Sequence, residues 1–345
     1  MNILFLCEGS TVPASRFRVA QFLPHFEQAG IRATVRYGYG ARFNQLSRTA
    51  LSTPYRLATR LKRAASVLDA GKYDLVFCQR PALPQSSLPE AFLRKLNPRI
   101  VFDFDDAIWL GPNGVSAPRR RRAFDEITQL ASHLIAGNNF LKNEANQPDK
   151  TSVIPTVIDA DRYCPSAPDR KRLVLGWMGT SGNFPFLAKL VPSLKRVLQK
   201  HPEAIVRLVS NAPFPALADH PQVEQVAWTA ESELEELRSF SIGLMPLVSS
   251  ELTRGKCAFK MITYMAVGTP VLVSDVGANR EVFGTGGAGY LLPSFDWDRE
   301  LSELIENQAT RDSMGEVGRA QVLEAYSVQS VLPRYLEIFE NVRNA

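Results

Sequence analysis

The stretch RGKCAFKMITYMAVGTPVLVSDVG, residues 254–277, decides how the rest of the chain is interpreted. Its pattern predicts a helix, a tight turn, a buried strand and a second turn, with Gly268 as the natural helix stop. Three cations, Arg254, Lys256 and Lys260, stand at the expected beginning of this helix. Because a helix N-terminus already carries partial positive charge, cations there are unfavourable unless an anion binds beside them.

The spacing within this helix strengthens the case for a bound anion. Lys256, Lys260 and Thr263 are spaced i, i+4 and i+7, so they would share one stripe. Together with Arg254 and the free helix N–H groups they would form an anion site, for which a diphosphate is the natural ligand. Charge-assisted hydrogen bonds contribute about 1.5–3 kcal/mol each, more than the roughly 0.3–1 kcal/mol cost of a cation at that helix end. The alternative stays open that Lys256 and Lys260 are surface residues whose long side chains hold the ammonium groups away from the helix end.

Outward from this stretch, short apolar runs alternate with amphipathic ones, which indicates parallel sheets with crossover helices. The first half offers six candidate strands: NILFLC, ATVRY, DLVFC, RIVFDF, HLIAG and TSVIP. After a stretch rich in Pro and charge, TVIDADRYCPSAPDRKR, the second half offers six more: RLVLGWMG, AIVRLVS, VEQVAW, SIGLMPL, PVLVS and GAGYLL. We expect helices between them, including RFRVAQFLPHFEQAG and the region 44–70.

The interruption between the two sets of strands predicts the domain organisation. We expect an α/β chain of two doubly wound domains, residues 1–165 and 166–325, with a last helix over residues 326–345. One large doubly wound sheet is the alternative. No apolar run approaches the ~20 residues that span a bilayer, and the opening residues MNILFLC predict a first buried strand and not a signal peptide.

Composition and charge limit the function classes. The chain has 345 residues, of which 45% are hydrophobic and 22% charged, as in globular proteins. Its four cysteines are scattered without a C-x-x-C spacing, which predicts reduced thiols in a cytoplasmic protein without a zinc site. Residues 1–165 hold 22 Lys and Arg against 14 Asp and Glu, and the remainder holds 18 against 21. The basic first half predicts an anionic partner, whether nucleic acid, acidic lipid or a phosphorylated substrate.

Two clusters account for much of that positive charge. One is the run Arg119 to Arg122, and the other is the helical stretch RLATRLKRAA, with Arg56, Arg60, Lys62 and Arg63. A solvated surface is the alternative interpretation for either cluster. Nucleic-acid binding is not expected, because neither cluster is interleaved with aromatic residues and no nucleic-acid motif is present.

Three further segments carry candidate site residues. The loop LGWMGTSGNFPF, residues 175–186, follows a strand and precedes a helix, and it is not a G-x-G-x-x-G dinucleotide fingerprint. Glycines in such a loop allow the backbone to approach a ligand closely. The candidates it offers for ligand contact are Gly179, Thr180, Ser181 and Asn183.

In the first half, FDFDDAIW places Asp103, Asp105 and Asp106 where a strand ends, the position at which parallel sheets meet ligands. A hydroxyl-rich ligand, a structural turn or a divalent metal would each suit these carboxylates. The loop CEGSTVPASRFR follows the first strand and brings Glu8, Gly9 and Ser10 to the same edge. Arg16 and Arg18 are expected in the first turn of the next helix, where they would bind an anion or pair with nearby carboxylates; the residues proposed from this loop are Glu8, Gly9, Ser10, Arg16 and Arg18.

These segments together resemble a known family. MAVGTPVLVSDVGANREVF with the later AGYLL is similar to the C-terminal domain of GT-B glycosyltransferases, specifically glycosyltransferase family 4. PASRFRVAQFLPHF resembles the first helix of a subgroup that builds bacterial polysaccharides. FDFDDAIW, IAGNNFLKNEA, SVIPTVID and SIGLMPL fit the same template, so the resemblance covers nearly the whole chain.

The resemblance implies a function and roles for residues. Two Rossmann-like domains would face each other across a cleft, the second holding a nucleoside-diphosphate sugar and the first an acceptor, with retention at the anomeric carbon and no metal or other cofactor. The last helix, residues 326–345, would cross back to the first domain. Lys256 and Lys260 would stabilise the departing diphosphate. Asp105 and Asp106 would contact sugar or acceptor hydroxyls. Thr180 and Asn183 stand near the places of the family's donor-binding Arg and Lys, and Glu281 would orient the donor loop.

The chain departs from the family pattern at two positions. Gly255 and Thr263 stand where the family has two glutamates, the second of which holds the donor ribose. The alternatives are therefore a degenerate GT-B module that binds nucleotide or sugar without transfer, and an epimerase-like enzyme. For the transferase we expect a glycan or lipid-linked acceptor, cytoplasmic location and peripheral contact with an anionic membrane at its inner face.

Overall fold

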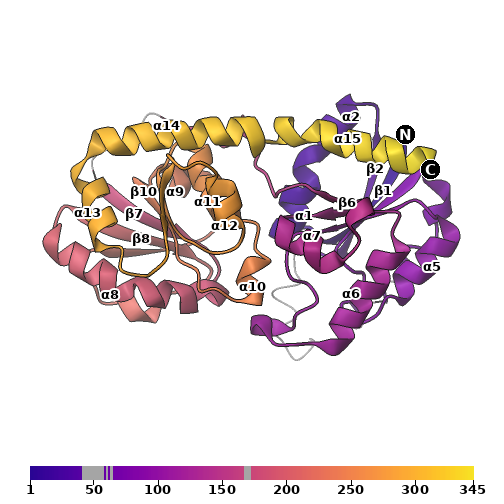
Figure 1. Ribbon diagram of the computed structural model, residues 1–345, viewed down its shortest axis with the longest axis horizontal. Coiled ribbons are helices and arrows are strands. Elements are labelled where there is room, and N and C mark those ends of the chain that lie inside the picture. The colour runs from indigo at the N-terminus through magenta and orange to yellow at the C-terminus, as the bar shows by residue number, and fades with distance from the viewer. Residues whose placement is uncertain (41–57, 60, 63–64, 167–171) are drawn as a thin grey trace. The chain divides into compact units, whose positions relative to one another are not determined.

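The computed structural model in Figure 1 describes residues 1–40, 58–59, 61–62, 65–166 and 172–345. The chain divides into two compact units. Unit 1 comprises Met1–Val157, Gly255–Cys257 and Val331–Ala345, and unit 2 comprises Ile158–Arg254 and Ala258–Ser330. The sequence placed this boundary near residue 165 and the return to the first domain at 326. Most of the predicted helix 44–70, including the basic residues Arg56, Arg60 and Arg63, lies outside the described residues.

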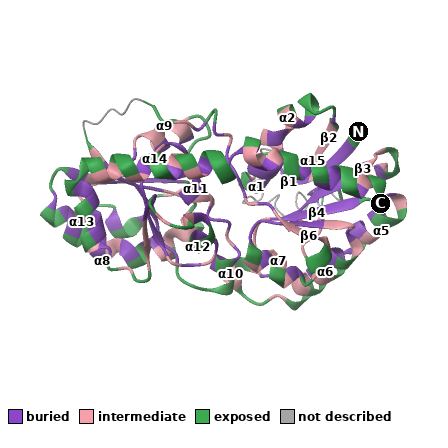
Figure 2. Cartoon of the chain, turned by 45° about the horizontal axis from the view of Figure 1, so that its top comes forward, coloured by how far each residue is buried: buried purple, intermediate pink, exposed green. Residues whose placement is uncertain are grey.

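Unit 1 is built on a parallel six-stranded sheet of order β2-β1-β3-β4-β5-β6 within the described residues. Each of its strands overlaps one predicted apolar run, although several ends differ by one or two residues. The strands are β1 (Asn2–Gly9), β2 (Arg32–Tyr39), β3 (Leu75–Gln79), β4 (Ile100–Phe104), β5 (His133–Ala136) and β6 (Thr151–Val153). Every residue of β3 and β4 is buried, as expected for a sheet covered on both faces, and Figure 2 colours these strands purple.

The described helices of unit 1 cover that sheet. The predicted single helix RFRVAQFLPHFEQAG is wrong: three short pieces replace it, because a proline begins the second helix and Val19 leaves helical geometry. The last helix adds Tyr335 and Phe339 to the core, where the Phe26 and Phe339 ring centroids are 5.5 Å apart. The helices are α1 (Pro13–Arg18), α2 (Leu23–Gln28), α5 (Leu88–Leu96), α6 (Pro118–Leu130), α7 (Asn139–Ala145) and α15 (Val328–Asn344), with short 3-10 turns at Ala20–Phe22, Ala70–Lys72, Pro112–Gly114 and Pro148–Lys150.

Unit 2 repeats the architecture with a different strand order, β12-β11-β10-β7-β8-β9, again parallel and six-stranded. Its strands are β7 (Leu173–Met178), β8 (Ala204–Ser210), β9 (Val223–Ala227), β10 (Ile242–Met245), β11 (Val271–Ser274) and β12 (Gly289–Leu292). The sheets of both units are thus doubly wound, and the alternative of one large sheet is wrong.

The helices of unit 2 pack on a core that includes Trp177, Leu190, Leu244 and Trp297. A Cβ on Gly315 would lie 2.1 Å from the carbonyl oxygen of Gly268, so the helix α14 (Gln308–Ala325) passes too close to that turn for any larger residue at position 315. None of the described helices is long and apolar enough to cross a bilayer. The helices of unit 2 are α8 (Phe184–Lys200), α9 (Glu233–Arg238), α10 (Glu251–Arg254), α11 (Phe259–Ala266), α12 (Ala278–Phe283), α13 (Asp298–Glu306) and α14 (Gln308–Ala325), with 3-10 turns at Ser181–Asn183 and Pro215–Leu217.

The predicted helix at 254–267 begins later than expected. Arg254 ends α10, and α11 begins only at Phe259, after Ala258 adopts a left-handed conformation with φ +52°. The expectation that Lys256 shares a helical stripe with Lys260 is therefore wrong, because Lys256 lies in the irregular segment between the two helices. The predicted stop at Gly268 is confirmed by its φ of +74°.

Candidate functional site

Ligands of doubly wound sheets bind at the carboxyl ends of the strands, where the strand order changes direction. In unit 1 this switch point lies between β1 and β3, and in unit 2 it lies between β7 and β10. Most of the site residues proposed from the sequence fall at these two edges. Each edge is therefore a candidate site within its own unit.

The unit 1 edge is organised by Arg80, a residue that the sequence analysis missed. Its guanidinium donates to one Asp105 oxygen from Nε at 3.0 Å and from Nη2 at 2.8 Å. Its Nη1 donates to Glu8 at 3.0 Å, and Nη2 lies 3.8 Å from an Asp106 oxygen. The signal was present in the sequence, since carboxylates at the end of a buried strand need a cation and Arg80 follows the neighbouring strand directly.

The two adjacent aspartates are in different electrostatic states. Burial raises the pKa of Asp105, but the charges of Arg80 and Arg18 outweigh it, so this pKa lies below its usual value. For Asp106 burial dominates over the charges of Arg80 and Lys256, and the pKa lies above its usual value. The Asp106 side chain is also the more accessible, 36% exposed against 11% for Asp105. Such divergence between neighbouring carboxylates is typical of groups with different tasks.

The segment Gly255–Cys257 belongs to unit 1, although it lies far along the chain. Asn138 Nδ2 donates to the Lys256 carbonyl at 2.9 Å, and the Cys257 thiol donates to the Asp105 carbonyl at 3.1 Å. A Cβ on Gly137 would come within 2.3 Å of the Cys257 sulfur, so only glycine admits this segment. The segment brings the half-buried Lys256 close enough to affect the charge of Asp106.

Arg18 has a different place from the one expected. It lies in the last turn of α1, is 1% exposed, and makes a buried ion pair with Asp103 while Nη1 donates to the Ile154 carbonyl at 2.8 Å. The expectation that Arg18 binds an acceptor is wrong, because its donors are used inside the core. Arg16 is also in the last turn of α1 and not the first, with its guanidinium carbon 4.9 Å from the centre of the Phe17 ring.

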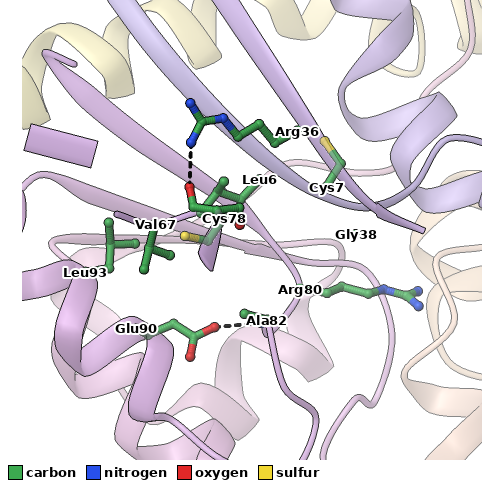
Figure 3. Close-up of a pocket in the computed structure, with 11 residues that line it drawn as sticks. Leu6, Cys7, Arg36, Gly38, Val67, Cys78, Arg80, Ala82, Glu90 and Leu93 are labelled. Carbon is green, nitrogen blue, oxygen red and sulfur yellow. Dashed lines mark hydrogen bonds between the residues drawn. The ribbon is translucent and has the colours of Figure 1, made fainter. Parts of the chain in front are cut away.

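The remaining residues proposed near β1 lie at the same edge as Arg80. Glu8 is an ion-pair partner, Gly9 is buried and its N–H donates to Ser15, and Ser10 is exposed. Figure 3 shows the cavity behind Arg80, which is lined by Cys78 and Glu90 among others. Its volume of about 20 Å³ is room for one water molecule. A sugar would therefore have to bind at the open edge and not in this cavity.

The unit 2 edge brings together two of the segments singled out in the sequence. The Lys260 ammonium lies 4.6 Å from the centre of the Trp177 ring, and a Cβ on Gly179 would come within 2.5 Å of it. Lys260 thus reaches from the first turn of α11 to the carboxyl end of β7, directly at the switch point. Trp177 is the second residue that the sequence analysis missed, since an aromatic within a strand signals only core packing.

The loop after Gly179 is held by its own polar groups. Asn211 accepts the Ser181 N–H at 2.8 Å, and the Asn183 amide donates to the Thr180 hydroxyl at 3.1 Å. Thr180 is exposed, so the loop presents backbone and hydroxyl groups at the rim of the unit 2 edge. This arrangement suits close approach of a ligand to backbone, as the glycines predict.

Other proposed donor residues lie nearby with different surroundings. Thr263 is buried and its hydroxyl donates to the Lys260 carbonyl at 2.7 Å, which leaves only acceptor capacity for a ligand. Arg254 is exposed at the end of α10, and Glu281 is exposed on α12. A Cβ on Gly277 would come within 2.9 Å of the Arg254 Cα, so the turn before α12 packs against the end of α10.

Two features lie apart from these edges or limit their chemistry. A hollow of about 670 Å³ in unit 2 lies between residues of α14 and the segments at the beginnings of β7, β10 and β11, at the opposite ends of the strands from Gly179. Among the described residues, no three His, Cys, Asp or Glu side chains gather closely enough to hold a metal ion. Two of the three aspartates once considered for a metal, Asp103 and Asp105, are instead paired with arginines.

Comparison with known proteins finds a family match in the second half of the chain. Residues 172–310 match the family model described as glycosyl transferases group 1. The alpha-maltose-1-phosphate synthase of Mycobacterium tuberculosis is 25% identical over 253 residues, which are 61% of this chain and 64% of that protein. The chain therefore spans less than two thirds of the length of the curated relatives that it matches first.

Solved structures share the fold at low sequence identity. Anabaena HepE in complex with UDP-glucose superposes with a TM-score of 0.75 and 16% identity, covering 99% of this chain and 100% of that one. A sucrose-phosphate synthase from Thermosynechococcus elongatus gives a TM-score of 0.69 and 13% identity, covering 99% of each chain. The two Rossmann-like units are thus those of the GT-B fold, as the sequence resemblance implied.

Proposed function

We propose, for a chain whose residues 172–310 match the family model described as glycosyl transferases group 1, that it transfers a sugar from a uridine-diphosphate sugar to a hydroxyl acceptor. The observation that carries the proposal is the Lys260 ammonium at the carboxyl end of β7, against Gly179. HepE, which shares the fold, has been solved with UDP-glucose, and this supports uridine as the base.

Unit 2 would hold the donor. The diphosphate would accept hydrogen bonds from Lys260 and from the loop Gly179–Asn183, with each charge-assisted bond contributing about 1.5–3 kcal/mol. These groups act most strongly where charge develops on the departing diphosphate. Because Trp177 fixes the ammonium before any ligand arrives, little reorganisation is needed at the moment of reaction.

The chemistry would proceed with retention and without a metal. The bond between the anomeric carbon and the diphosphate breaks, the acceptor oxygen forms a bond to the same face, and the acceptor proton passes to the diphosphate. Lys260 of unit 2 supplies positive charge in place of a metal ion, and no protein nucleophile is needed. Product anomers distinguished by NMR, and activity retained in EDTA, test these two features.

Unit 1 would bind the acceptor, a glycan or lipid-linked glycan of a bacterial surface polysaccharide, at the cytoplasmic face of a membrane. Its edge presents Glu8, Arg80 and Asp106, which suit sugar hydroxyls. Exposed apolar residues Leu88 and Phe92 on α5 lie beside α6, whose Arg119 and Arg122 are also exposed. That combination suits an anionic membrane surface.

Calorimetric titration with UDP, GDP, CDP, ADP and dTDP tests the donor assignment, on the wild type and on Lys260→Ala. We expect micromolar binding of UDP by the wild type and its loss in the variant. Lys200→Ala, which removes an exposed lysine paired with Glu306 at 3.1 Å, is the control and should bind UDP normally. Absence of binding by all five nucleotides to the wild type would remove the basis of the proposal.

A degenerate module that binds nucleotide without transfer is the second candidate. The observation in its favour is that Gly255 and Thr263 replace two acidic residues, and that the Thr263 hydroxyl donates within its own helix. Such a module would bind UDP, but it would not cleave UDP-glucose, so no UDP would be produced with any acceptor offered. Turnover with one acceptor eliminates it.

A further inference from the structure

At the unit 1 edge Arg80 contacts three carboxylates, those of Glu8, Asp105 and Asp106. Arg80 donates two hydrogen bonds to Asp105 and one to Glu8, whereas its contact with Asp106 is a longer 3.8 Å. We propose that Arg80 is a positioning residue that fixes Asp105 and Glu8 and leaves Asp106 as the carboxylate that orients the acceptor hydroxyl. This inference rests on the proposed function and deepens it.

The backbone of Arg80 supports a role beyond stability. Its φ of +63° places a non-glycine residue in the left-handed region directly after β3. L-residues other than glycine avoid this region, and those held there cluster at functional sites. The conformation is held by the Arg80 N–H, which donates to the Asp103 carbonyl at 2.9 Å. The result is that the guanidinium lies across the ends of β1, β3 and β4 at once.

Asp105 accepts hydrogen bonds within this network through both its side chain and its backbone carbonyl. One of its side-chain oxygens receives both Arg80 bonds, and its backbone carbonyl receives the Cys257 thiol at 3.1 Å. Its side chain is only 11% exposed. A carboxylate bound in this way is poorly placed to take a hydrogen bond from an incoming hydroxyl, so its charge serves to hold Arg80.

Asp106 has the opposite surroundings. Its Oδ1 accepts the neighbouring Ala107 N–H at 3.0 Å, while Oδ2 has only the distant Arg80 contact among the described residues. The charged groups that face it are Arg80, Lys256 and Asp105, and the Cys257 thiol beside it is neutral because burial raises the pKa of that thiol. Asp106 is thus the accessible hydrogen-bond acceptor of the edge.

Asp106 orients the acceptor hydroxyl and forms no covalent bond to the substrate. The ionised carboxylate accepts the hydrogen bond of the acceptor O–H and so orients the acceptor oxygen for attack. As the new C–O bond forms and the bond to diphosphate breaks, the proton moves to a diphosphate oxygen. Asp106 ends the reaction in the ionised form in which it began.

The sign of the pH dependence follows from the charges. Arg80 and Lys256 lower the pKa of Asp106 against the effect of burial. Removing Arg80 must therefore raise this pKa, so the ionised form appears only at higher pH. Activity in Arg80→Met would be lost most at the acidic end and recover as pH rises through the new pKa, whereas a purely structural defect would lower activity equally at every pH.

The experiment measures UDP release from UDP-glucose between pH 5 and 9, with water or added glycans as acceptor. In Arg80→Met we expect kcat/KM at low pH to fall about 10- to 100-fold, the effect of one hydrogen bond to a charged group, with the acid limb moved to higher pH. Arg80→Lys keeps the positive charge but lacks the forked donors of the guanidinium. It should therefore return the acid limb of the pH profile to its wild-type position without restoring the full rate. Arg196→Met is the control, because Arg196 bridges Asp296 and Asp298 in unit 2 as Arg80 bridges two carboxylates.

A second readout does not depend on turnover. Aspartate labelled with ¹³C at the carboxyl carbon is titrated by NMR in the wild type, Arg80→Met, Asp105→Asn and Asp106→Asn, the last two giving the assignments. We expect Asp106 to titrate above Asp105, and both to move upward in Arg80→Met. The reverse order, or an acid limb unmoved in Arg80→Met, overturns the inference. UDP binding by calorimetry should be unchanged in every Arg80 variant, and its absence in the wild type would instead signal failure of the proposed function.

Discussion

Lys260 stands in the first turn of α11, where a cation is unfavourable for the helix itself, and its ammonium lies over the Trp177 ring. A cation–π contact of this kind contributes roughly 0.5–2 kcal/mol, which offsets the helix cost. The arrangement leaves the charge fixed at the end of β7, so the residue is prepared for an anion before one binds.

We therefore expect Lys260→Ala to reduce turnover by ~100-fold or more, since a group that stabilises developing charge is lost. The measurement is kcat for UDP release from a UDP-sugar at saturating donor. Lys200→Ala provides the comparison for a generic loss of one surface lysine. A turnover in Lys260→Ala within a factor of about three of wild type would take Lys260 out of the mechanism.

Gly179 offers a more delicate test, because an added methyl group alone would disturb the lysine. A Cβ there would meet Lys260 Nζ at 2.5 Å and Trp177 Cζ2 at 2.9 Å. We expect Gly179→Ala to weaken UDP binding about tenfold, or 1.4 kcal/mol, while the chain stays folded. Gly182→Ala is the matched control in the same loop, since its Cβ would have no neighbour closer than 3.9 Å. Equal affinities in the two variants would contradict the placement of the diphosphate at this edge.

At the scale of elements, the strands could be predicted and one decisive helix start could not. Each apolar run proposed in the two halves became a strand. In β3, β4, β7, β10 and β11 at least four consecutive residues are buried, as expected of central strands in a covered sheet. The start of α11 was missed because periodicity continued through Gly255–Cys257, whereas this segment is irregular and makes tertiary contacts with Gly137 and Asn138.

For the ion pairs of the unit 1 edge, the sequence indicates that the carboxylates need a cation, but not which arginine supplies it. Arg18 and Asp103 are 85 positions apart, and Arg80 and Glu8 are 72 apart. Patterns within a window place each residue on its element, but they do not say which arginine meets which carboxylate. These pairings determine the site, because Arg18 is buried with Asp103 whereas Arg80 lies at the unit 1 edge with Glu8.

The buried pair between α1 and β4 gives a prediction about stability. Arg18→Met would leave the fully buried Asp103 carboxylate without its partner, which typically costs about 3–5 kcal/mol. We expect a lowered first unfolding transition in calorimetry, and a large recovery in the double variant Arg18→Met with Asp103→Leu. Arg36→Met, which breaks a pair with Asp69 that is 31% exposed on each side, should change stability by less than ~1 kcal/mol. Equal effects of Arg18→Met and Arg36→Met would show that the buried pair is not structural.

The segment Gly255–Cys257 gives a second prediction at this scale. A Cβ on Gly137 would overlap the Cys257 sulfur at 2.3 Å, so Gly137→Ala should displace the segment and destabilise the chain by about 1–3 kcal/mol. The double variant Gly137→Ala with Cys257→Ala removes the overlapping sulfur and should recover much of the loss. Thermal melting of the three proteins decides this, and a double variant no more stable than Gly137→Ala would refute the packing argument.

At the scale of the whole molecule, the positive charge is concentrated in the first half of the sequence, which holds 22 Lys and Arg against 14 Asp and Glu. The described part of this charge includes exposed Arg119 and Arg122 on α6. Leu88 is 75% exposed and Phe92 44% exposed on α5. A hydrogen bond between Ser87 and Glu126 joins the two helices, so the apolar and basic side chains occupy neighbouring elements.

This surface leads to a prediction for the intact chain. Each Arg near an anionic bilayer contributes about 1 kcal/mol, and apolar side chains add to it by burial. We expect binding to vesicles of phosphatidylglycerol and phosphatidylcholine at low salt, weakened by salt because exposed charges are screened. Leu88→Ser with Phe92→Ser should reduce binding at every salt concentration, and Arg119→Gln with Arg122→Gln chiefly at low salt. Leu323→Ser, at a residue 50% exposed in unit 2, is the matched control. If the wild type stays with the supernatant at low salt, this surface does not bind lipid, and the proposal of an acceptor held at a membrane loses its support.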